Sequence, residues 1–405
     1  MTDRLYYTDP YLRAFDATII AVARRDGRMA LTLDRTAFYP TSGGQPFDTG
    51  TLGGLRIVDV VDEDDGSIAH IIELTTQNSE LTTGDAVHGE IAWARRFDHM
   101  QQHTGQHVLS AAFDKLFGVR TVSFHLGAVL STIDLAREMT PAEITAAENE
   151  ANRIVWEDRP VAIRFADAEE AARLPLRKEP ARGGTLRLID VEGFDLSACG
   201  GTHVARTGGI GVIAVASWER FKGGQRLEFV CGGRALGGYR LLRDAVTASV
   251  RLLSVLPEEL PAGIERLQGE AKEQKRAIAG LQTDLARYRA DELAAAAEEV
   301  RLGADGTVKL VARALDADAN GLKSLATAIA ARPGLLIALV SNTTPALVVI
   351  ARSSDVAISA QQLLATLTAE FGGRGGGRAE MAQGGGLAAS SDAIIAAVRA
   401  AIWLG

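Results

Sequence analysis

Cysteine, an excess of positive charge and long apolar runs are scarce or missing in this chain. Its 405 residues include only two cysteines, which offer no disulfide framework and fit a reducing compartment. The formal net charge of −8 argues against a generally basic nucleic-acid coat, though not against a local basic patch. No apolar run approaches membrane-spanning length, and Met1 to Tyr7 lack the pattern of a signal peptide. We therefore expect a cytoplasmic protein that makes no use of a membrane.

Histidine is also infrequent, and its placement is the most informative feature of the chain. The motifs His103-Thr-Gly-Gln-His107 and Cys199-Gly-Gly-Thr-His203 hold three of the seven histidines and one of the two cysteines. Residues four apart on a helix share a face, so both imidazoles of the first motif can reach one ion. Glycines relax the backbone of the second motif, so that thiolate and imidazole can bend toward a common point. Three nitrogens and one sulfur suit zinc, and the sequence predicts one zinc ion per chain.

Each motif has a plainer interpretation when it is taken alone. A helical histidine pair is often only a polar face, and a cysteine beside a histidine is more often a buried small side chain. The two motifs occur together in a chain that is poor in both residue types. Their combination therefore favours one shared metal site with His103, His107, Cys199 and His203 as ligands.

The length and an apolar content of 47% predict a folded α+β protein of several domains. Residues 1–92 carry short strand-like runs separated by turn residues, which is typical of a small β-barrel. A segment rich in glycine and proline, residues 38–50, interrupts these runs. It is either a shaped loop that approaches a ligand closely or an elaborate turn of the barrel.

Residues 93–234 change to a mixed helical and strand pattern, which predicts an α+β domain that contains both metal motifs. A helix is expected from Arg95, with its histidines facing inward beside apolar neighbours. A second helix is expected to begin at Pro141, behind the capping residue Thr140, and to continue to about Trp156.

Residues 235–300 are strongly helical, with a break at Pro257 to Pro261. Apolar residues in the second helix alternate in steps of three and four, which is a heptad seam. The seam packs either on the preceding helix as a hairpin, which we favour, or on a second subunit of a homodimer.

Residues 301–405 predict a separate α/β domain, because continuous apolar strands alternate with helical segments. Its segment of residues 372–386 contains eight glycines together with Arg374 and Arg378. We expect a flexible, donor-rich loop able to approach an anionic backbone, with an interdomain linker as the alternative.

In this order, the motifs resemble the free-standing alanyl-tRNA editing proteins, which are relatives of the editing half of alanyl-tRNA synthetase. The resemblance covers nearly the whole chain. Phe38-Tyr-Pro-Thr-Ser-Gly-Gly-Gln45 is similar to the family's glycine-rich barrel motif, and the two metal motifs match its zinc half-sites. Gly372-Gly-Arg-Gly-Gly-Gly-Arg-Ala-Glu-Met-Ala-Gln383 is similar to the C-terminal motif of its long form. Thr41 and Ser42 depart from the pattern, because many relatives carry an acidic residue before the glycines.

This resemblance implies a zinc-dependent hydrolase that removes serine or glycine from the 3′ end of mischarged tRNA(Ala). A full synthetase needs several hundred further N-terminal residues, and the Asp-His-His signature of related phosphoesterases is absent, so neither aminoacylation nor nuclease activity is expected. The resemblance also makes residues 93–234 the editing domain and the acceptor end of tRNA(Ala) the partner. A homodimer through the helical or the C-terminal domain is a further expectation.

Within the implied active site we assign roles to Thr36, Gln45 and Thr202. Thr36 and Gln45 flank the glycine loop and are candidates to bond the seryl hydroxyl, with turn stabilisation as the alternative. Thr202 is expected to line the pocket. Gln106 lies between the two histidines, points off their face and is expected to be structural.

Contacts to RNA are expected from Lys222, Arg226, Arg374 and Arg378. For the turn at residues 222–226, a solvated hairpin that contacts no RNA is an alternative of equal weight. Three other functions stay open. The first is a zinc-stabilised RNA-binding protein without catalysis. The second is a deacylase of another mischarged tRNA such as Ser-tRNA(Thr), and the third is a metal hydrolase of a small ester.

Overall fold

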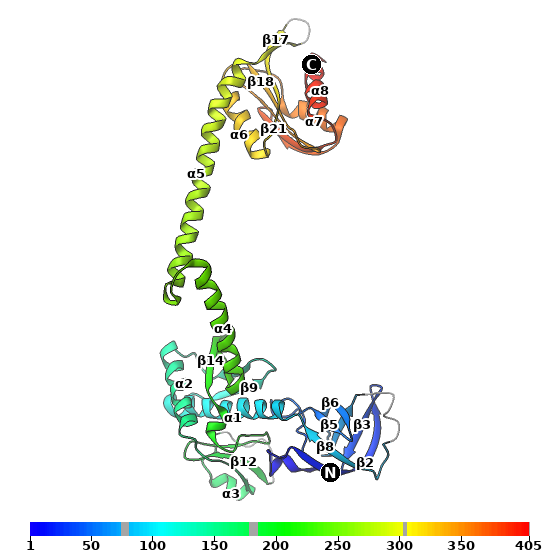
Figure 1. The fold of residues 1–405 in the computed structure, drawn as a ribbon, viewed down its shortest axis with the longest axis vertical. Coiled ribbons are helices and arrows are strands. Elements are labelled where there is room, and N and C mark those ends of the chain that lie inside the picture. Colours follow the sequence, from blue (N-terminus) through cyan, green and yellow to red (C-terminus); the bar gives the residue numbers. More distant parts are fainter. Residues whose placement is uncertain (74–80, 178–184, 303–305, 405) are drawn as a thin grey trace. The chain divides into compact units, whose positions relative to one another are not determined.

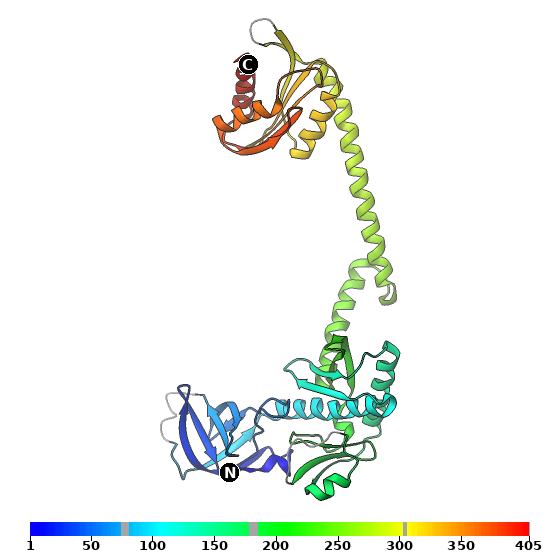
Figure 2. The same ribbon diagram turned by 180° about the vertical axis from the view of Figure 1, so that it is seen from behind.

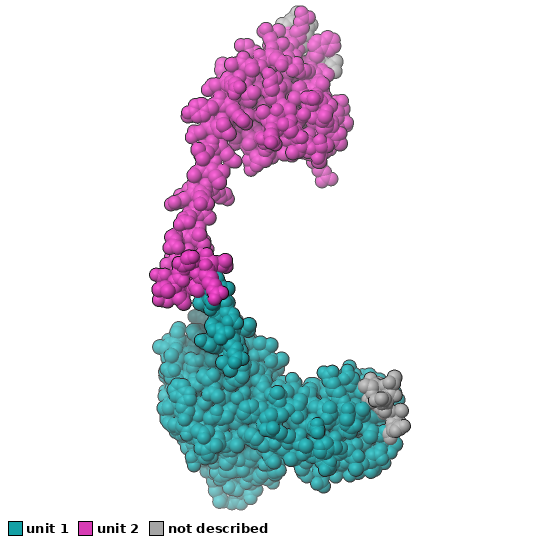
Figure 3. Space-filling model, viewed as in Figure 1, with its two compact units in different colours: residues 1–248 teal, residues 249–405 magenta. Residues whose placement is uncertain are grey.

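The computed structural model (Figures 1 and 2) describes residues 1–73, 81–177, 185–302 and 306–404. The chain forms two compact units, residues 1–248 and 249–405 (Figure 3). Over these described ranges the structure contains eight α-helices together with several β-sheets, as expected for an α+β protein of several domains. Within the same ranges, no helix is long and apolar enough to cross a membrane.

The first unit begins with a closed six-stranded barrel, as the strand pattern predicts (Figure 1). Its strands follow the order β2, β3, β7, β6, β5 and β8, with bounds Ala14–Arg25, Arg28–Leu33, Ile68–Ile72, Leu55–Asp62, Gly50–Leu52 and Ala86–Ile91. A short parallel pair, β1 (Asp3–Arg4) with β4 (Arg35–Thr36), accompanies the barrel. The glycine-rich segment leaves β4 and returns at β5, so the barrel presents this loop at one of its ends.

A buried ion pair joins this loop to the first long helix, α1 (Trp93–Phe117). Arg96 donates from Nε to Asp48 at 2.9 Å and from Nη1 to the carbonyl of Pro10 at 2.9 Å. Both side chains are inaccessible to solvent. Because breaking a buried pair leaves an uncompensated charge, this contact holds the barrel loop firmly on α1.

The barrel interior also contains a buried histidine, His70 on β7. Its Nδ1 donates to the carbonyl of Leu31 at 3.0 Å, so its Nε2 accepts the hydroxyl of Thr36 at 2.8 Å. Burial lowers the pKa of His70 to about 4. The folded protein therefore keeps this imidazole neutral under conditions in which the unfolded chain protonates it.

We expect the free energy of unfolding of the first unit to fall as the pH falls from about 6.5 to 4. In that window the unfolded chain binds a proton at His70 that the folded protein does not bind. The free energy of unfolding therefore falls by at most about 3 kcal/mol. Urea unfolding at several pH values measures how the free energy of unfolding changes with pH. For His70→Leu this slope should correspond to about one proton fewer than for the unmodified protein. An unchanged slope would show that His70 titrates normally in the folded state.

The rest of the first unit surrounds α1 with two sheets and a second helix. One sheet has the order β14, β15, β10 and β9, with bounds Ile213–Phe221, Gly224–Cys231, Ser131–Leu135 and Thr121–Leu126. The other has β11 (Val161–Ala166), β12 (Leu186–Val191) and β13 (Asp195–Ala198), with the short α3 (Ala168–Arg173) after β11.

Helix α2 (Pro141–Trp156) begins and ends where the sequence predicts. The side chain of Thr140 accepts from the backbone of Glu143, and the Glu143 side chain accepts from the backbone of Thr140, which forms a reciprocal capping box. This cap satisfies backbone donors that the first turn leaves open.

Helices α4 (Gly232–Leu253) and α5 (Leu260–Ala295) follow, with the 3-10 turn η3 (Pro257–Glu259) between them. The break falls at the predicted place, but Pro261 lies inside α5, in its first turn. Proline is tolerated there because the first turn needs no N–H donor at that position. The helical hairpin itself stays a prediction.

The second unit is built on a six-stranded sheet (Figure 2) in the order β16, β17, β18, β19, β21 and β20. Their bounds are Glu298–Leu302, Gly306–Leu315, Leu335–Ser341, Ala346–Arg352, Met381–Leu387 and Arg374–Gly377. Helices α7 (Ala360–Phe371) and α8 (Ser391–Leu404) pack on one face of the sheet. Helix α6 (Ala319–Ala330) and the end of α5 pack on the other, which explains the continuous apolar strands.

The prediction of a flexible loop over residues 372–386 is wrong. Most of this segment forms the hairpin of β20 and β21, and β21 pairs with β19 inside the sheet. A Cβ at Gly375 would meet the carbonyl oxygen of Gln383 at 2.5 Å, so the strands approach too closely for a side chain there. The glycines allow these strands to pack closely. Glycine content by itself predicts a flexible loop, because the sequence does not show which strands lie next to it.

Candidate metal centre and its cavity

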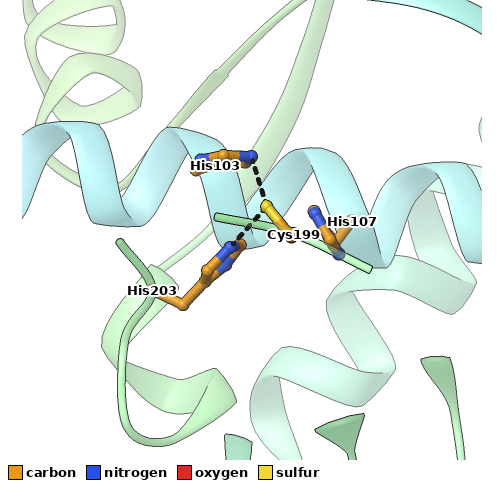
Figure 4. Close-up of side chains that lie close together, drawn as sticks. All are labelled: His103, His107, Cys199 and His203. Carbon is orange, nitrogen blue, oxygen red and sulfur yellow. Dashed lines mark hydrogen bonds between the residues drawn. The ribbon is translucent and has the colours of Figure 1, made fainter. Parts of the chain in front are cut away.

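Two segments bring four metal-competent side chains to one point in the first unit (Figure 4). Helix α1 presents His103 and His107 on one face, and the loop after β13 carries Cys199 and His203. The Sγ of Cys199 lies 3.4 Å from Nε2 of His103 and 3.3 Å from Nε2 of His203. One ligand atom from each of the four residues lies within 4.8 Å of the others. The convergence predicted from the spacing of the motifs is present.

Gln45 from the barrel loop orients the first of these ligands. Its Oε1 accepts from Nδ1 of His103 at 2.8 Å and from the backbone N–H of Thr202 at 3.1 Å. Its Nε2 donates to the hydroxyl of Thr202 at 2.8 Å. With Nδ1 of His103 occupied as a donor, Nε2 carries the lone pair and faces the thiol.

The other two imidazoles are held in the same way. Nδ1 of His107 donates to the carboxylate of Asp195 at 3.1 Å. The hydroxyl of Thr104 donates to a main-chain carbonyl at 2.8 Å and accepts from Nδ1 of His203 at 3.2 Å. All three histidines therefore turn Nε2 toward Cys199, and each ring has a partner that sets its tautomer.

The charges in this cluster shift the pKa values of its members. Burial alone would raise the pKa of Cys199, but His103 and His203 outweigh it and hold the thiol pKa well below its usual range. Burial lowers the pKa of His107, but the hydrogen bond with Asp195 prevails and raises it to about 8. Burial and the neighbouring His103 lower the pKa of His203 to about 3. A thiolate is therefore favoured at the centre, as a metal ligand requires.

The donor set fits zinc. Three imidazole nitrogens and one thiolate at mutual separations of a few ångströms match a four-coordinate tetrahedral site. The glycines of the second motif contribute to this fit, because a Cβ at Gly201 would overlap the imidazole of His103. A Cβ at Gly200 would only touch the hydroxyl of Tyr7 at 3.5 Å. Close packing of loop on helix thus decides which glycine the site requires.

A cavity of about 370 Å³ opens beside the cluster. His107 and Cys199 form part of its wall, and Phe124 stands on the opposite segment, β9. The ring of Phe124 packs 5.6 Å from that of His103, centroid to centroid. The cavity gives a ligand access to the cluster from one side.

The residues that we assigned to the pocket from the sequence lie deeper than expected. Thr36 is fully buried inside the barrel, where its hydroxyl contacts His70 and accepts from the N–H of Phe38 at 3.1 Å. Thr202 is buried against Gln45, and none of Thr36, Gln45 and Thr202 lines the cavity described above. Their contacts are those of positioning residues, and a direct role toward a substrate stays a prediction.

The four basic residues predicted to contact RNA occupy two places. Lys222 is exposed at the turn between β14 and β15. Arg226 pairs with Asp134 at 2.7 Å, with its side chain 30% exposed. Arg374 and Arg378 are exposed on and just after β20, at the edge of the C-terminal sheet. The RNA contacts themselves stay predictions.

The sequence analysis gave no role to two residues of the centre. Thr104 lies inside the first motif, one position after His103, and the helical pattern places it on the side of the histidines without indicating its hydrogen bond to His203. Asp195 lies four residues before Cys199 on β13. One aspartate among many carries no signal by itself, since only the folding of β13 against α1 pairs it with His107.

Comparison with known proteins agrees with this architecture. Three family models match the chain: "tRNA synthetases class II (A)" over residues 12–95, "Threonyl and Alanyl tRNA synthetase second additional domain" over residues 186–228, and "DHHA1 domain" over residues 306–404. The alanyl-tRNA editing protein AlaX-L of Pyrococcus horikoshii is 32% identical over 95% of this chain and 94% of its own length. The chain belongs to the alanyl-tRNA editing proteins.

Other relatives of this family member are longer. The alanine–tRNA ligases of Pyrococcus furiosus and Methanoculleus marisnigri are 32% and 36% identical over 95% and 96% of this chain. The chain spans 42% of the length of each. The solved C-Ala domain of Aquifex aeolicus alanyl-tRNA synthetase matches 26% of this chain and 97% of that domain at 22% identity. Its TM-score of 0.23 is too low to bear on the fold.

Proposed function

We propose that this protein hydrolyses the ester that joins serine or glycine to the terminal ribose of mischarged tRNA(Ala), and that it does so with a bound zinc ion. One observation carries the proposal: two members of the four-residue cluster, His107 and Cys199, line an accessible cavity in a chain of this family. The ligands would be His103, His107, Cys199 and His203. A purely structural zinc site needs no such opening.

The protein's part in this reaction is to bind and orient. Zinc, when bound, supplies a positive charge that polarises the ester or a water molecule. Gln45 and Asp195 hold two of the imidazoles in the orientation that the centre needs. No carboxylate is among the described residues that line the cavity, so this wall provides no acidic general base. Hydrolysis then depends on positioning and on activation of water at the centre.

The acceptor end of tRNA(Ala) is the proposed partner, and phosphate contacts would come from Lys222, Arg226, Arg374 and Arg378. A homodimer is proposed through the seam of α5. Six large apolar side chains of that seam are between 44% and 70% exposed, namely Ile264, Leu267, Ile278, Leu281, Leu285 and Tyr288. A heptad seam is normally covered by the seam of another helix, and here a second copy of the chain would supply that helix.

A structural zinc in a non-catalytic RNA-binding protein is the second candidate. The four protein ligands favour it, because a complete set leaves no open position for water. A third possibility is deacylation of Ser-tRNA(Thr), because residues 186–228 match a domain that threonyl and alanyl tRNA synthetases share.

The deciding experiment is single-turnover deacylation by the zinc-loaded full chain. Ser-tRNA(Ala), Gly-tRNA(Ala), Ala-tRNA(Ala) and Ser-tRNA(Thr) would be compared, before and after zinc is removed by a chelator and restored. We expect rapid loss of serine or glycine from tRNA(Ala), little loss of alanine, and recovery upon zinc addition. Tight RNA binding without hydrolysis would select the non-catalytic candidate, and preferred hydrolysis of Ser-tRNA(Thr) would select the other editing function.

Replacing Gln45 should weaken zinc binding without removing a ligand. Gln45→Leu deletes the acceptor for Nδ1 of His103, and loss of such an orienting partner costs about 10- to 100-fold in metal affinity. Gln45→Glu keeps an acceptor at that place and serves as the matched variant, with a smaller expected loss. Competition with a chromophoric chelator measures both. Equal affinities for Gln45→Leu and the unmodified protein would show that His103 needs no such partner.

A further inference from the structure

Size cannot explain how the cavity would reject alanine. Alanine is serine without its hydroxyl, so any pocket that admits a seryl ester has room for an alanyl ester as well. Strong rejection of the smaller residue requires a polar group of the protein that stays buried and unpaired when the hydroxyl is missing. Selectivity for serine therefore requires such a group in the wall of the cavity of about 370 Å³ beside the metal cluster.

Most polar side chains in the cavity wall are already paired within the protein. Arg177 donates from Nε to Asp195 at 2.6 Å, and the hydroxyl of Ser197 donates to the same carboxylate at 3.1 Å. The hydroxyl of Ser123 donates to Asp134. Since these donors are committed to carboxylates, they are not poised to read a neutral hydroxyl.

Gln106 differs from these neighbours in the same wall. Its side chain is 3% exposed, and its Nε2 donates to the hydroxyl of Ser110 at 2.8 Å. Ser110 also receives a hydrogen bond from Thr121 at 2.7 Å. The Oε1 of Gln106, in contrast, is buried and has no partner among the described residues. An unpaired buried acceptor is costly, and a donor on a ligand would relieve that cost.

We propose that Oε1 of Gln106 accepts a hydrogen bond from the seryl hydroxyl and makes this protein selective for serine over both alanine and glycine. The proposal rests on the proposed function, because it names the feature of the substrate that this cavity reads. Alanine and glycine both lack the hydroxyl, so either of them leaves Oε1 without the donor that serine would supply. The same acceptor thus disfavours hydrolysis of Ala-tRNA(Ala) and makes Ser-tRNA(Ala) a better substrate than Gly-tRNA(Ala).

The α-amino group of the substrate is the competing donor for this acceptor. Every aminoacyl ester carries that group, so an acceptor that binds it contributes equally to serine, glycine and alanine. A purely structural amide, as the sequence analysis expects for Gln106, also contributes nothing to selectivity. The ratio of activities between seryl and glycyl substrates therefore separates the proposal from both alternatives.

The test is Gln106→Met, which keeps the length of the side chain and removes the acceptor. We expect the ratio of kcat/KM for Ser-tRNA(Ala) over Gly-tRNA(Ala) to fall about 30-fold, the value of one hydrogen bond to a buried group. Gln101→Met is the matched control, because Gln101 lies on the same helix, bonds the carbonyl of Gly209 at 3.0 Å and does not line the cavity. Its ratio should not change. An unchanged ratio in Gln106→Met, whether both rates fall or neither does, overturns the proposal.

A binding measurement on the unmodified, zinc-loaded protein does not depend on the variant folding or on catalysis. Its probes are adenosines that carry serine, glycine or alanine through a stable 3′-amide. We expect the seryl amide to bind at least about 10-fold more tightly than either of the others. Equal binding of all three overturns the proposal even if deacylation is observed. Selective binding without any deacylation leaves the role of Gln106 standing while the hydrolase function fails.

Discussion

Replacing Cys199 by alanine should abolish zinc binding and lower the rate of Ser-tRNA(Ala) deacylation by at least about 1,000-fold, which corresponds to about 4 kcal/mol of transition-state stabilisation. Cys199 is the one anionic ligand of the cluster, and it faces Nε2 of both His103 and His203. Without the thiolate, the three remaining imidazoles lose the charge that balances the ion. Elemental analysis of the purified variant and single-turnover deacylation measure the two effects.

Cys231 offers the matched control, because it is the other cysteine of the chain. It is buried on β15, where its Sγ packs on α1 beside Gly105, but it is not one of the four clustered residues, and burial raises the pKa of its thiol. Cys231→Ala should keep a full equivalent of zinc and most of the activity, at a cost in stability of about 1–2 kcal/mol for the small cavity. If Cys199→Ala retained zinc and hydrolysed its substrate normally, both the assignment of the centre and its role would be wrong.

The second large effect is expected from a methyl group added to Gly201. Its Cβ would overlap the imidazole of His103. The loop of the second motif must then move away from α1 and carry Cys199 and His203 with it. We expect Gly201→Ala to lose most of its zinc and to reduce deacylation by at least about 100-fold, since misplacement of about 1 Å already costs that much.

Gly200→Ala is the companion variant, one residue away in the same motif. Its Cβ would make an ordinary contact of 3.5 Å with Tyr7, and the residue needs no left-handed backbone. Zinc content and rate should stay within a few-fold of the unmodified protein. Equal behaviour of the two alanine variants would mean that the loop adapts freely and that its packing on α1 is not what forms the centre.

The convergence of the four metal-competent side chains was predictable because each pair is local. Helical spacing of four residues brings His103 and His107 to one face, and the short spacing of Cys199 and His203 keeps them in one loop, where Gly201 allows close packing on His103. Short strand-like runs separated by turn residues likewise predicted the barrel, and continuous apolar runs predicted the covered C-terminal sheet. The N-terminus of α2 followed from Thr140 and Pro141, whose effects reach only one helical turn.

Contacts that close over long stretches of sequence were not predictable. The residues that set the tautomers of His103 and His107 are Gln45 and Asp195, which lie 58 and 88 residues away in the chain. The glycine-rich hairpin of β20 and β21 was misread as a loop, because only its neighbours in the sheet show how closely the strands approach.

The sequence by itself determined the family resemblance and the four side chains that lie together, because these depend on residue type and short spacing. The tertiary structure decided which side chains face the cavity beside the metal cluster. Thr36 lies inside the barrel, where its hydroxyl donates to His70. Oε1 of Gln106 lies beside the metal cluster without a hydrogen-bond partner among the described residues. Whether a buried polar atom finds a partner depends on every element packed around it, and no local pattern in the chain records that outcome.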